Sequence, residues 1–90
     1  MTKEELARAF VAGRPGRCYN AHTDGTTYTL HASPIAKRVG DQVQFYWHGD
    51  YTLTTASHMN QILRALDAKF RVSYTAAKRS GQTHFVWEVK

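Results

Sequence analysis

The stretch Tyr51–Leu66, YTLTTASHMNQILRAL, decides the fold, because a helix start signal is followed there by a long apolar period. Thr54 and Thr55 are of a residue type whose hydroxyl group commonly accepts a hydrogen bond from a free amide of the first helical turn. Four apolar residues then follow at the spacing i, i+3, i+4 and i+7, which places them on one side of an α-helix. The sequence therefore predicts a main helix over about residues 55–67. The apolar residues of this helix are Met59, Ile62, Leu63 and Leu66.

Strand-like sequence lies before this helix, so a sheet is its expected packing partner. Segments 17–23 and 27–31 are separated by Asp24-Gly25, a dipeptide typical of tight hairpin turns. After the interruption at Ser33-Pro34, a short strand is expected over residues 35–39, with Lys37 and Arg38 in it. These segments predict neighbouring antiparallel strands.

Gly40-Asp41 then turns the chain into segment 42–47, where side chains of two kinds alternate. We expect one set to pack on the main helix and the other to face solvent or a partner. The first set is Val43, Phe45 and Trp47, and the second is Gln44, Tyr46 and His48.

The two ends of the chain add three further elements. Thr2 and Glu5 have the spacing of a capping box, so a short helix is predicted over about residues 2–12, with Gly13 as its C-terminal cap. The loop Arg14-Pro15-Gly16-Arg17 follows this helix. Alternating apolar residues in 70–75 and 83–89 predict a C-terminal β-hairpin, with a basic tip at Lys78-Arg79.

Together these elements predict an α+β fold, an antiparallel sheet of four to six strands packed on one main helix. Ninety residues suffice for one core and not for two, so residues 1–90 are expected to form a single domain.

Composition excludes some classes of protein. No apolar run approaches the ~18 residues of a membrane span, and the first ten residues lack the pattern of a secretory signal. Cys18 is the single cysteine, which rules out an intrachain disulfide and favours a reduced cytoplasmic setting. Twelve Lys and Arg against seven Asp and Glu give a net charge of +5, which favours encounters with nucleic acid or acidic proteins.

The central stretch also carries a resemblance. The run Gly49–Thr55, followed by Met59-Asn60 and Ile62-Leu63, is similar to a pattern in small bacteriophage-encoded proteins of uncharacterised function. In those proteins a strand ends in Gly-Trp, continues as Thr-x-Thr-Thr and enters a helix that carries Leu-Asn, with an Ile-Ala pair upstream, here Ile35-Ala36. This chain departs from the pattern at Asp50 and Met59. The resemblance implies a phage accessory protein that acts in the host cytoplasm on a host enzyme or defence system, as anti-CRISPR proteins do; it implies no catalytic residues.

No catalytic or metal-binding pattern is expected. A structural zinc site needs ligands in close array, whereas the five histidines are spread along the chain and are predicted to lie on the surface. A catalytic cysteine would need a histidine base, and Arg17 lies next to Cys18, where a positive charge favours the thiolate. A lone cysteine in a strand is, however, typically a small buried apolar residue. We therefore predict a protein that is not an enzyme and that needs no metal or cofactor.

Two kinds of partner stay open at this point. A host protein is the first expectation, because the large aromatic residues are of the type that anchors protein interfaces. Nucleic acid is the alternative, because aromatic and basic residues interleaved on a sheet can stack on bases and contact phosphates. A homodimer is a further alternative, because there is more aromatic bulk than one helix–sheet interface requires. The candidate binding residues are Arg14, Arg17, Lys37, Arg38, Tyr46, His48, Lys78 and Arg79.

Overall fold

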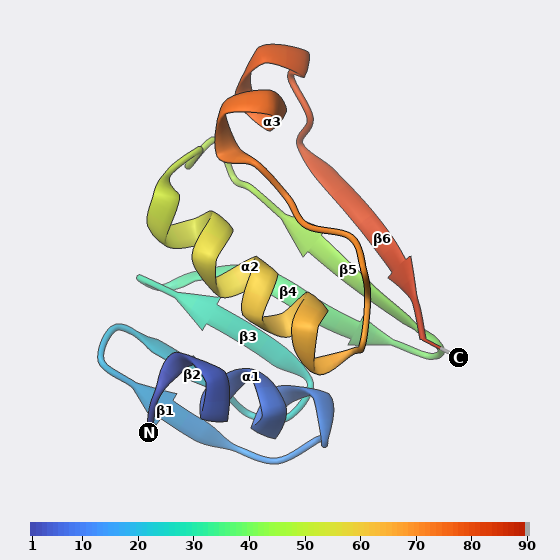
Figure 1. Cartoon of the computed structure of the whole chain (residues 1–90). Helices are drawn as coiled ribbons and strands as arrows, with labels where there is room; N and C mark the ends of the chain where they lie inside the picture. The colour runs from blue at the N-terminus through green and yellow to red at the C-terminus, as the bar shows by residue number, and fades with distance from the viewer. Residues whose placement is uncertain (90) are drawn as a thin grey trace.

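The computed structural model, which describes residues 1–89, is a six-stranded antiparallel sheet with helices on one face (Figure 1). The strands lie in chain order, β1 to β6, so each strand pairs with the one before it. The predicted α+β class, with an antiparallel sheet on one main helix, is confirmed. The elements are α1 (Lys3–Val11), β1 (Gly16–Cys18), β2 (Ala21–Thr23), β3 (Thr27–Leu30), β4 (Ser33–Val39), β5 (Gln42–Tyr46), α2 (Leu53–Ala65), α3 (Tyr74–Ser80) and β6 (His84–Glu88).

The core lies between the sheet and the helices α1 and α2, which run side by side across the same face (Figure 1). The three residues of the 42–47 segment that were predicted to face the main helix, Val43, Phe45 and Trp47, are fully buried. Met59, Ile62 and Leu63 of α2 are fully buried too, and Leu66 packs partly buried against the same cluster. The predicted apolar side of the main helix is therefore confirmed.

The main helix begins two residues earlier than predicted. Its N-cap is Thr52, whose Oγ1 accepts a hydrogen bond from the Thr55 amide at 3.2 Å. Thr55 is fully buried and its hydroxyl donates to the Asp50 carboxylate at 3.3 Å. Thr54 is exposed. The sequence offers three threonines in four positions, and the cap falls on the first of them, Thr52.

The predicted N-terminal helix and its capping box are confirmed, whereas its C-cap is Ala12 and not the predicted Gly13. Thr2 and Glu5 form the capping box, with Glu5 donating its amide to Thr2 Oγ1 at 3.1 Å and Thr2 donating its amide to Glu5 Oε1 at 2.8 Å. After the helix, Gly13 has a φ of +75°. A Cβ on Gly25, in the β2–β3 turn, would lie 2.5 Å from the Gly13 carbonyl oxygen. The turn predicted at Asp24-Gly25 therefore packs closely on the end of α1, and only glycine leaves room for it.

The segment predicted as a single strand over residues 17–23 is two short strands. The chain turns at Tyr19, which has a φ of +52° and is 94% exposed, and then at Asn20. β1 and β2 flank this turn and pair with each other. Gly16, predicted in the loop, belongs to β1, as does Arg17, which was predicted at the border between the loop and the strand; Arg14 and Pro15 do lie in the loop.

The predicted C-terminal β-hairpin is wrong, because segment 70–75 is not a strand and β6 pairs with β5 instead. The backbone of Val72 bonds to a side chain: its amide donates to Asn60 Oδ1 at 2.7 Å and its carbonyl accepts from Asn60 Nδ2 at 3.1 Å. Ser73 then caps α3, and Gly81 ends it with a φ of +72°. The backbone groups that a hairpin would need are thus occupied by α2 and by a helix start.

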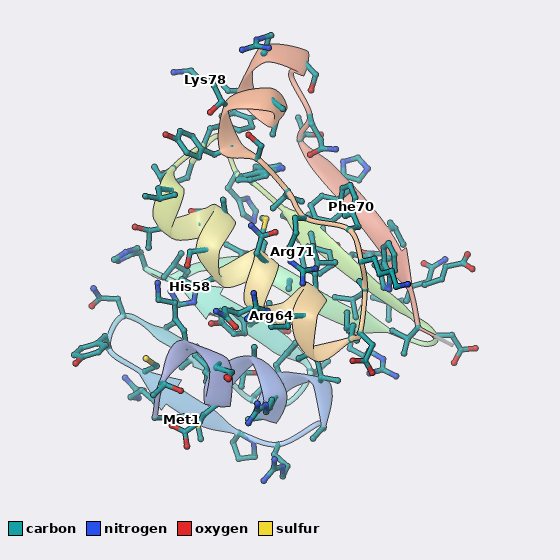
Figure 2. The ribbon with its side chains drawn as sticks, viewed as in Figure 1. Met1, His58, Arg64, Phe70, Arg71 and Lys78 are labelled. Carbon is teal, nitrogen blue, oxygen red and sulfur yellow. The ribbon has the colours of Figure 1, made fainter. Side chains whose placement is uncertain are left out.

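Phe70 is held against the sheet by aromatic contacts. Its ring stacks on Trp87 at a centroid distance of 6.2 Å and meets Phe85 edge-on at 6.0 Å. Figure 2 shows Phe70 beside β6. The alternating apolar residues of 70–75 therefore reflect packing of an extended strap on β6 and α2 and not a strand pairing.

Candidate functional site

The two faces of the sheet carry different side chains, and only one face is covered by helices (Figure 1). Along β3 and β5 buried residues alternate with half-buried ones, and along β6 half-buried residues alternate with exposed ones, so every second side chain of these strands points away from the helices. We call this uncovered side of the sheet the open face. Its outward side chains are Arg17, His22, Thr27, Thr29, Pro34, Lys37, Val39, Gln42, Gln44, Tyr46, His84, Val86 and Glu88.

The open face brings together three of the predicted binding residues. Lys37 on β4 lies directly opposite Gln44 on β5, and Tyr46 is the next outward residue along β5. The Tyr46 hydroxyl donates to Gln44 Oε1. The rings of Tyr46 and His48 are 5.8 Å apart, and His48 Nε2 lies 2.6 Å from the Pro34 carbonyl oxygen. Lys37, Tyr46 and His48 therefore form one cluster over the β4–β5 half of the sheet.

The basic loop contributes one residue to the same face. Arg17 is exposed on β1 and lies opposite His22, whose neighbour on β3 is Thr29. Arg14 is exposed in the loop after α1 and does not belong to the sheet. Arg17 and Lys37 thus lie on one surface, with β2 and β3 between their strands.

The other three predicted binding residues lie elsewhere. Arg38 was predicted as a binding residue together with Lys37, but both lie in β4, and consecutive residues of a strand face opposite ways. Arg38 is opposite the buried Val43, and its Nε donates to the Gly40 carbonyl at 3.1 Å. Lys78 and Arg79 lie in the last turn of α3 and not at a hairpin tip; Figure 2 shows Lys78 at the far end of the molecule from Met1.

The charge of the open face is positive. Arg17 and Lys37 are its cations, Glu88 is its acid, and the other outward side chains are mostly hydroxyl, amide and imidazole groups. Its middle row, Thr27, Lys37, Gln44 and Val86, crosses four strands. Three members of this row, Thr27, Lys37 and Gln44, expose hydrogen-bonding groups, Val86 is apolar, and none of the four is aromatic.

A buried polar pair lies on the opposite side of the sheet. Tyr28 is fully buried, and its hydroxyl is hydrogen-bonded to Nδ1 of His58, which is 5% exposed. Desolvation, followed by the positive charges of Lys3 and His31, lowers the pKa of His58 to about 4. Burial, followed by the proximity of Cys18, raises the pKa of Tyr28. At neutral pH both side chains are therefore uncharged, and each provides the hydrogen-bond partner that the other needs when buried.

The prediction that all five histidines are surface residues is wrong for His58. Its spacing in the main helix was the available signal: His58 precedes Met59 and lies four residues before Ile62, which places it at the border of the apolar side. Tyr28 alternates inward on β3 and needs a partner for its hydroxyl, which neighbouring apolar residues cannot supply.

Cys18 is 7% exposed and packs in the core cluster, as predicted for a small apolar residue. It lines a shallow hollow of about 180 Å³ at the end of the sheet where the β1–β2 and β3–β4 turns meet. His58 and the exposed His31 line the same hollow. Within residues 1–89, no three His, Cys, Asp or Glu side chains converge on a point where a metal ion could sit.

None of the helices in residues 1–89 is long and apolar enough to cross a membrane. Comparison of the chain with protein-family models, with curated proteins and with solved structures returned no match. The features that bear on function are therefore those of the molecule itself: the open face, its charge and the edges of the sheet.

Proposed function

We propose that this chain is a non-enzymatic accessory protein of the phage type, which binds a host protein through the open face and thereby inhibits or redirects it. The observation that carries the proposal is the open face itself. Its middle row exposes a hydroxyl, a cationic and an amide group on three neighbouring strands, Thr27, Lys37 and Gln44, while the opposite face of the sheet packs into the core. A surface of this kind suits a partner with an acidic, hydrogen-bonding patch.

The composition of the middle row favours a protein over nucleic acid. Single-stranded nucleic acid is held on a sheet by exposed rings on which bases stack. Thr27, Lys37 and Gln44 occupy the centre of the open face, where such rings would be needed. Tyr46 lies to one side, half-buried, with its hydroxyl bonded to Gln44.

Nucleic acid is the second candidate, and the cluster of Lys37, Tyr46 and His48 favours it. A cation beside two neighbouring rings is the minimal arrangement for a phosphate contact and a stacked base. A nucleic-acid complex of this type loses affinity steeply as salt rises, because counterions are released from the phosphates.

The experiment is a tagged pull-down from bacterial lysate with and without nuclease, using two matched charge-reversal variants. Arg17→Glu/Lys37→Glu reverses the cations of the open face, and Lys78→Glu/Arg79→Glu reverses two exposed cations of α3. Each substitution changes the charge by −2, so both variants change the net charge from +5 to +1. A difference between them therefore reports position and not total charge.

If the proposal holds, one host protein is captured in stoichiometric amount, and nuclease treatment does not remove it. The α3 variant should still capture this protein, and the open-face variant should not. If the wild type and the α3 variant instead capture nucleic acid, and this binding is lost at high salt, nucleic acid is the partner and not a host protein. Equal binding by both variants would refute the open face as the binding surface.

A further inference from the structure

The two edges of the sheet are protected to different degrees. β1 has three residues, is preceded by Pro15, which has no backbone amide to donate, and carries Arg17. Short length, proline and charge are the usual means by which an edge strand avoids pairing with another chain. β6 has five residues, His84–Glu88, with neither proline nor lysine among them, and Val86 at its centre is 44% exposed.

The hydrogen bonds of β6 show which backbone groups are free. In an antiparallel ladder, alternate residues direct both backbone groups toward the same neighbour. Next to the strand ends, Trp47 donates its amide to the Thr83 carbonyl at 3.0 Å, and Val89 donates its amide to the Asp41 carbonyl at 2.7 Å. The odd-numbered residues of β6 therefore face β5. The residues whose amide and carbonyl point to the free edge are His84, Val86 and Glu88.

These three residues are self-complementary. If a second β6 lies antiparallel to the first with Val86 opposite its own copy, His84 lies opposite Glu88 of the second copy, and the reverse holds as well. Every free amide and carbonyl of the three residues is then paired. The side chains agree with this register, because an imidazole meets a carboxylate on the open face.

The inner face agrees with the same register. Phe85 of one copy lies opposite Trp87 of the other, at a position where side chains of an antiparallel pair approach most closely. Both rings are only half-buried in the single chain. They already belong to an aromatic group in which Phe45 stacks on Phe85 at 4.6 Å and Phe70 stacks on Trp87. Pairing of two copies would join two such groups across the edge.

We propose that β6 is the docking edge for β6 of a second copy of this chain, in an antiparallel pairing centred on Val86. The two sheets become one, and the two open faces lie on the same side of it. The contact is a short strand pair, so the dimer is expected to be weak and concentration-dependent. This inference does not depend on the proposed host partner, because it rests on the free backbone groups of β6 and not on Arg17 or Lys37 of the open face.

The first test is sedimentation equilibrium of the whole protein over a broad concentration range, with the variant Val86→Pro. The Val86 amide does not face β5, so proline removes no hydrogen bond within the chain, but it removes the two central bonds of the dimer. We expect at least about a tenfold loss of dimer affinity, from two hydrogen bonds of ordinary strength. A wild-type protein that stays monomeric up to the concentrations used for NMR would overturn the proposal.

The second test reads the register and uses surface substitutions that do not threaten folding. His84→Glu places two carboxylates opposite each other at both ends of the strand pair and should weaken the dimer. Adding Glu88→Lys places each newly introduced carboxylate opposite a lysine of the other copy and should restore the dimer to wild-type affinity or better. A double variant as weak as His84→Glu alone would refute the pairing centred on Val86.

A third measurement needs no substitution. The Val86 amide has no partner in the single chain, so its hydrogen exchange should slow markedly as the protein concentration rises. The Phe85 amide, which faces β5, serves as the internal control and should change much less. Equal concentration dependence at both amides would count against the edge.

Discussion

The two faces of the sheet are built from the same six strands but differ in what their side chains contact. On the covered face, Tyr28, Phe45 and Trp47 are fully buried against α1 and α2. On the open face, Lys37 and Gln44 stand opposite each other in solvent-accessible positions. Burial of apolar area is the main stabilising term, so the covered face should determine stability and the open face should be free to determine binding.

The largest expected effect is on the covered face. Leu63 is fully buried in α2, and replacement by alanine should lower the free energy of unfolding by about 2–5 kcal/mol, because it removes buried methyl groups and leaves a cavity. Urea denaturation followed by circular dichroism measures this change. A loss within experimental error would mean that the helix does not pack on the sheet as described.

The next effect is a pH dependence that comes from the Tyr28–His58 pair. The folded pKa of His58 is about 4, below its ordinary value of 6.5, so the unfolded chain binds more protons between these values. Stability should therefore be fully present above pH 6.5 and should fall as the pH decreases toward 4, by about 2–3 kcal/mol.

The control for this pH dependence is His58→Leu, since carboxylates elsewhere also titrate in acid. The variant should be less stable at pH 7, because the Tyr28 hydroxyl loses its partner, and its stability curve should be flatter between pH 6.5 and 4. Parallel curves for wild type and variant would contradict the role given to His58.

A smaller effect is expected at the start of α2. Thr52→Ala should cost about 0.5–2 kcal/mol, because the Thr55 amide loses its acceptor. Thr54→Ala is the matched control: it lies two positions away, is exposed, and alanine is the better helix former. Thermal or urea unfolding of both variants distinguishes the two threonines. Equal losses would contradict the assignment of the N-cap to Thr52.

The covered face was largely predictable from the sequence, because apolar periodicity is a local signal. Met59, Ile62 and Leu63 recur at the helical period, and Val43, Phe45 and Trp47 recur at the strand period. The turn at Asp24-Gly25 was predictable for a related reason: the Asp24 carboxylate accepts from the Thr26 and Thr27 amides at 2.8 Å, which is local chemistry.

What the sequence could not predict depends on contacts between distant residues. Segment 70–75 alternates like a strand, but whether it pairs with β6 or with a side chain depends on Asn60, a residue in another element. The helix α3, which follows this segment, did have local signals in the sequence, a serine at its N-cap (Ser73) and a glycine at its C-cap (Gly81). His58 was assigned to the surface because its partner, Tyr28, lies thirty positions away.

The open face was the least predictable region, because its residues are set by register. Lys37 and Arg38 are adjacent in sequence, and only strand pairing decides that Lys37 lies on the open face while Arg38 lies on the other. Of the predicted binding residues, Lys37, Tyr46 and His48 therefore lie together in the cluster on the open face, whereas Arg38, Lys78 and Arg79 lie outside it.

The smallest effect on stability is expected at Lys37, and it gives the sharpest test of the difference between the two faces. Lys37→Ala should change the free energy of unfolding by no more than about 0.5 kcal/mol, because its side chain is exposed and contacts solvent. The same substitution should weaken capture of the partner, because it removes the cation in the middle row of the open face. Arg64→Ala, an exposed cation on α2, is the control and should leave both quantities unchanged. If Lys37→Ala destabilised the fold as much as Leu63→Ala, the same face of the sheet would determine both binding and stability. If it changed neither the free energy of unfolding nor the capture of the partner, the binding surface would lie elsewhere, and the β6 edge would be the next region to test.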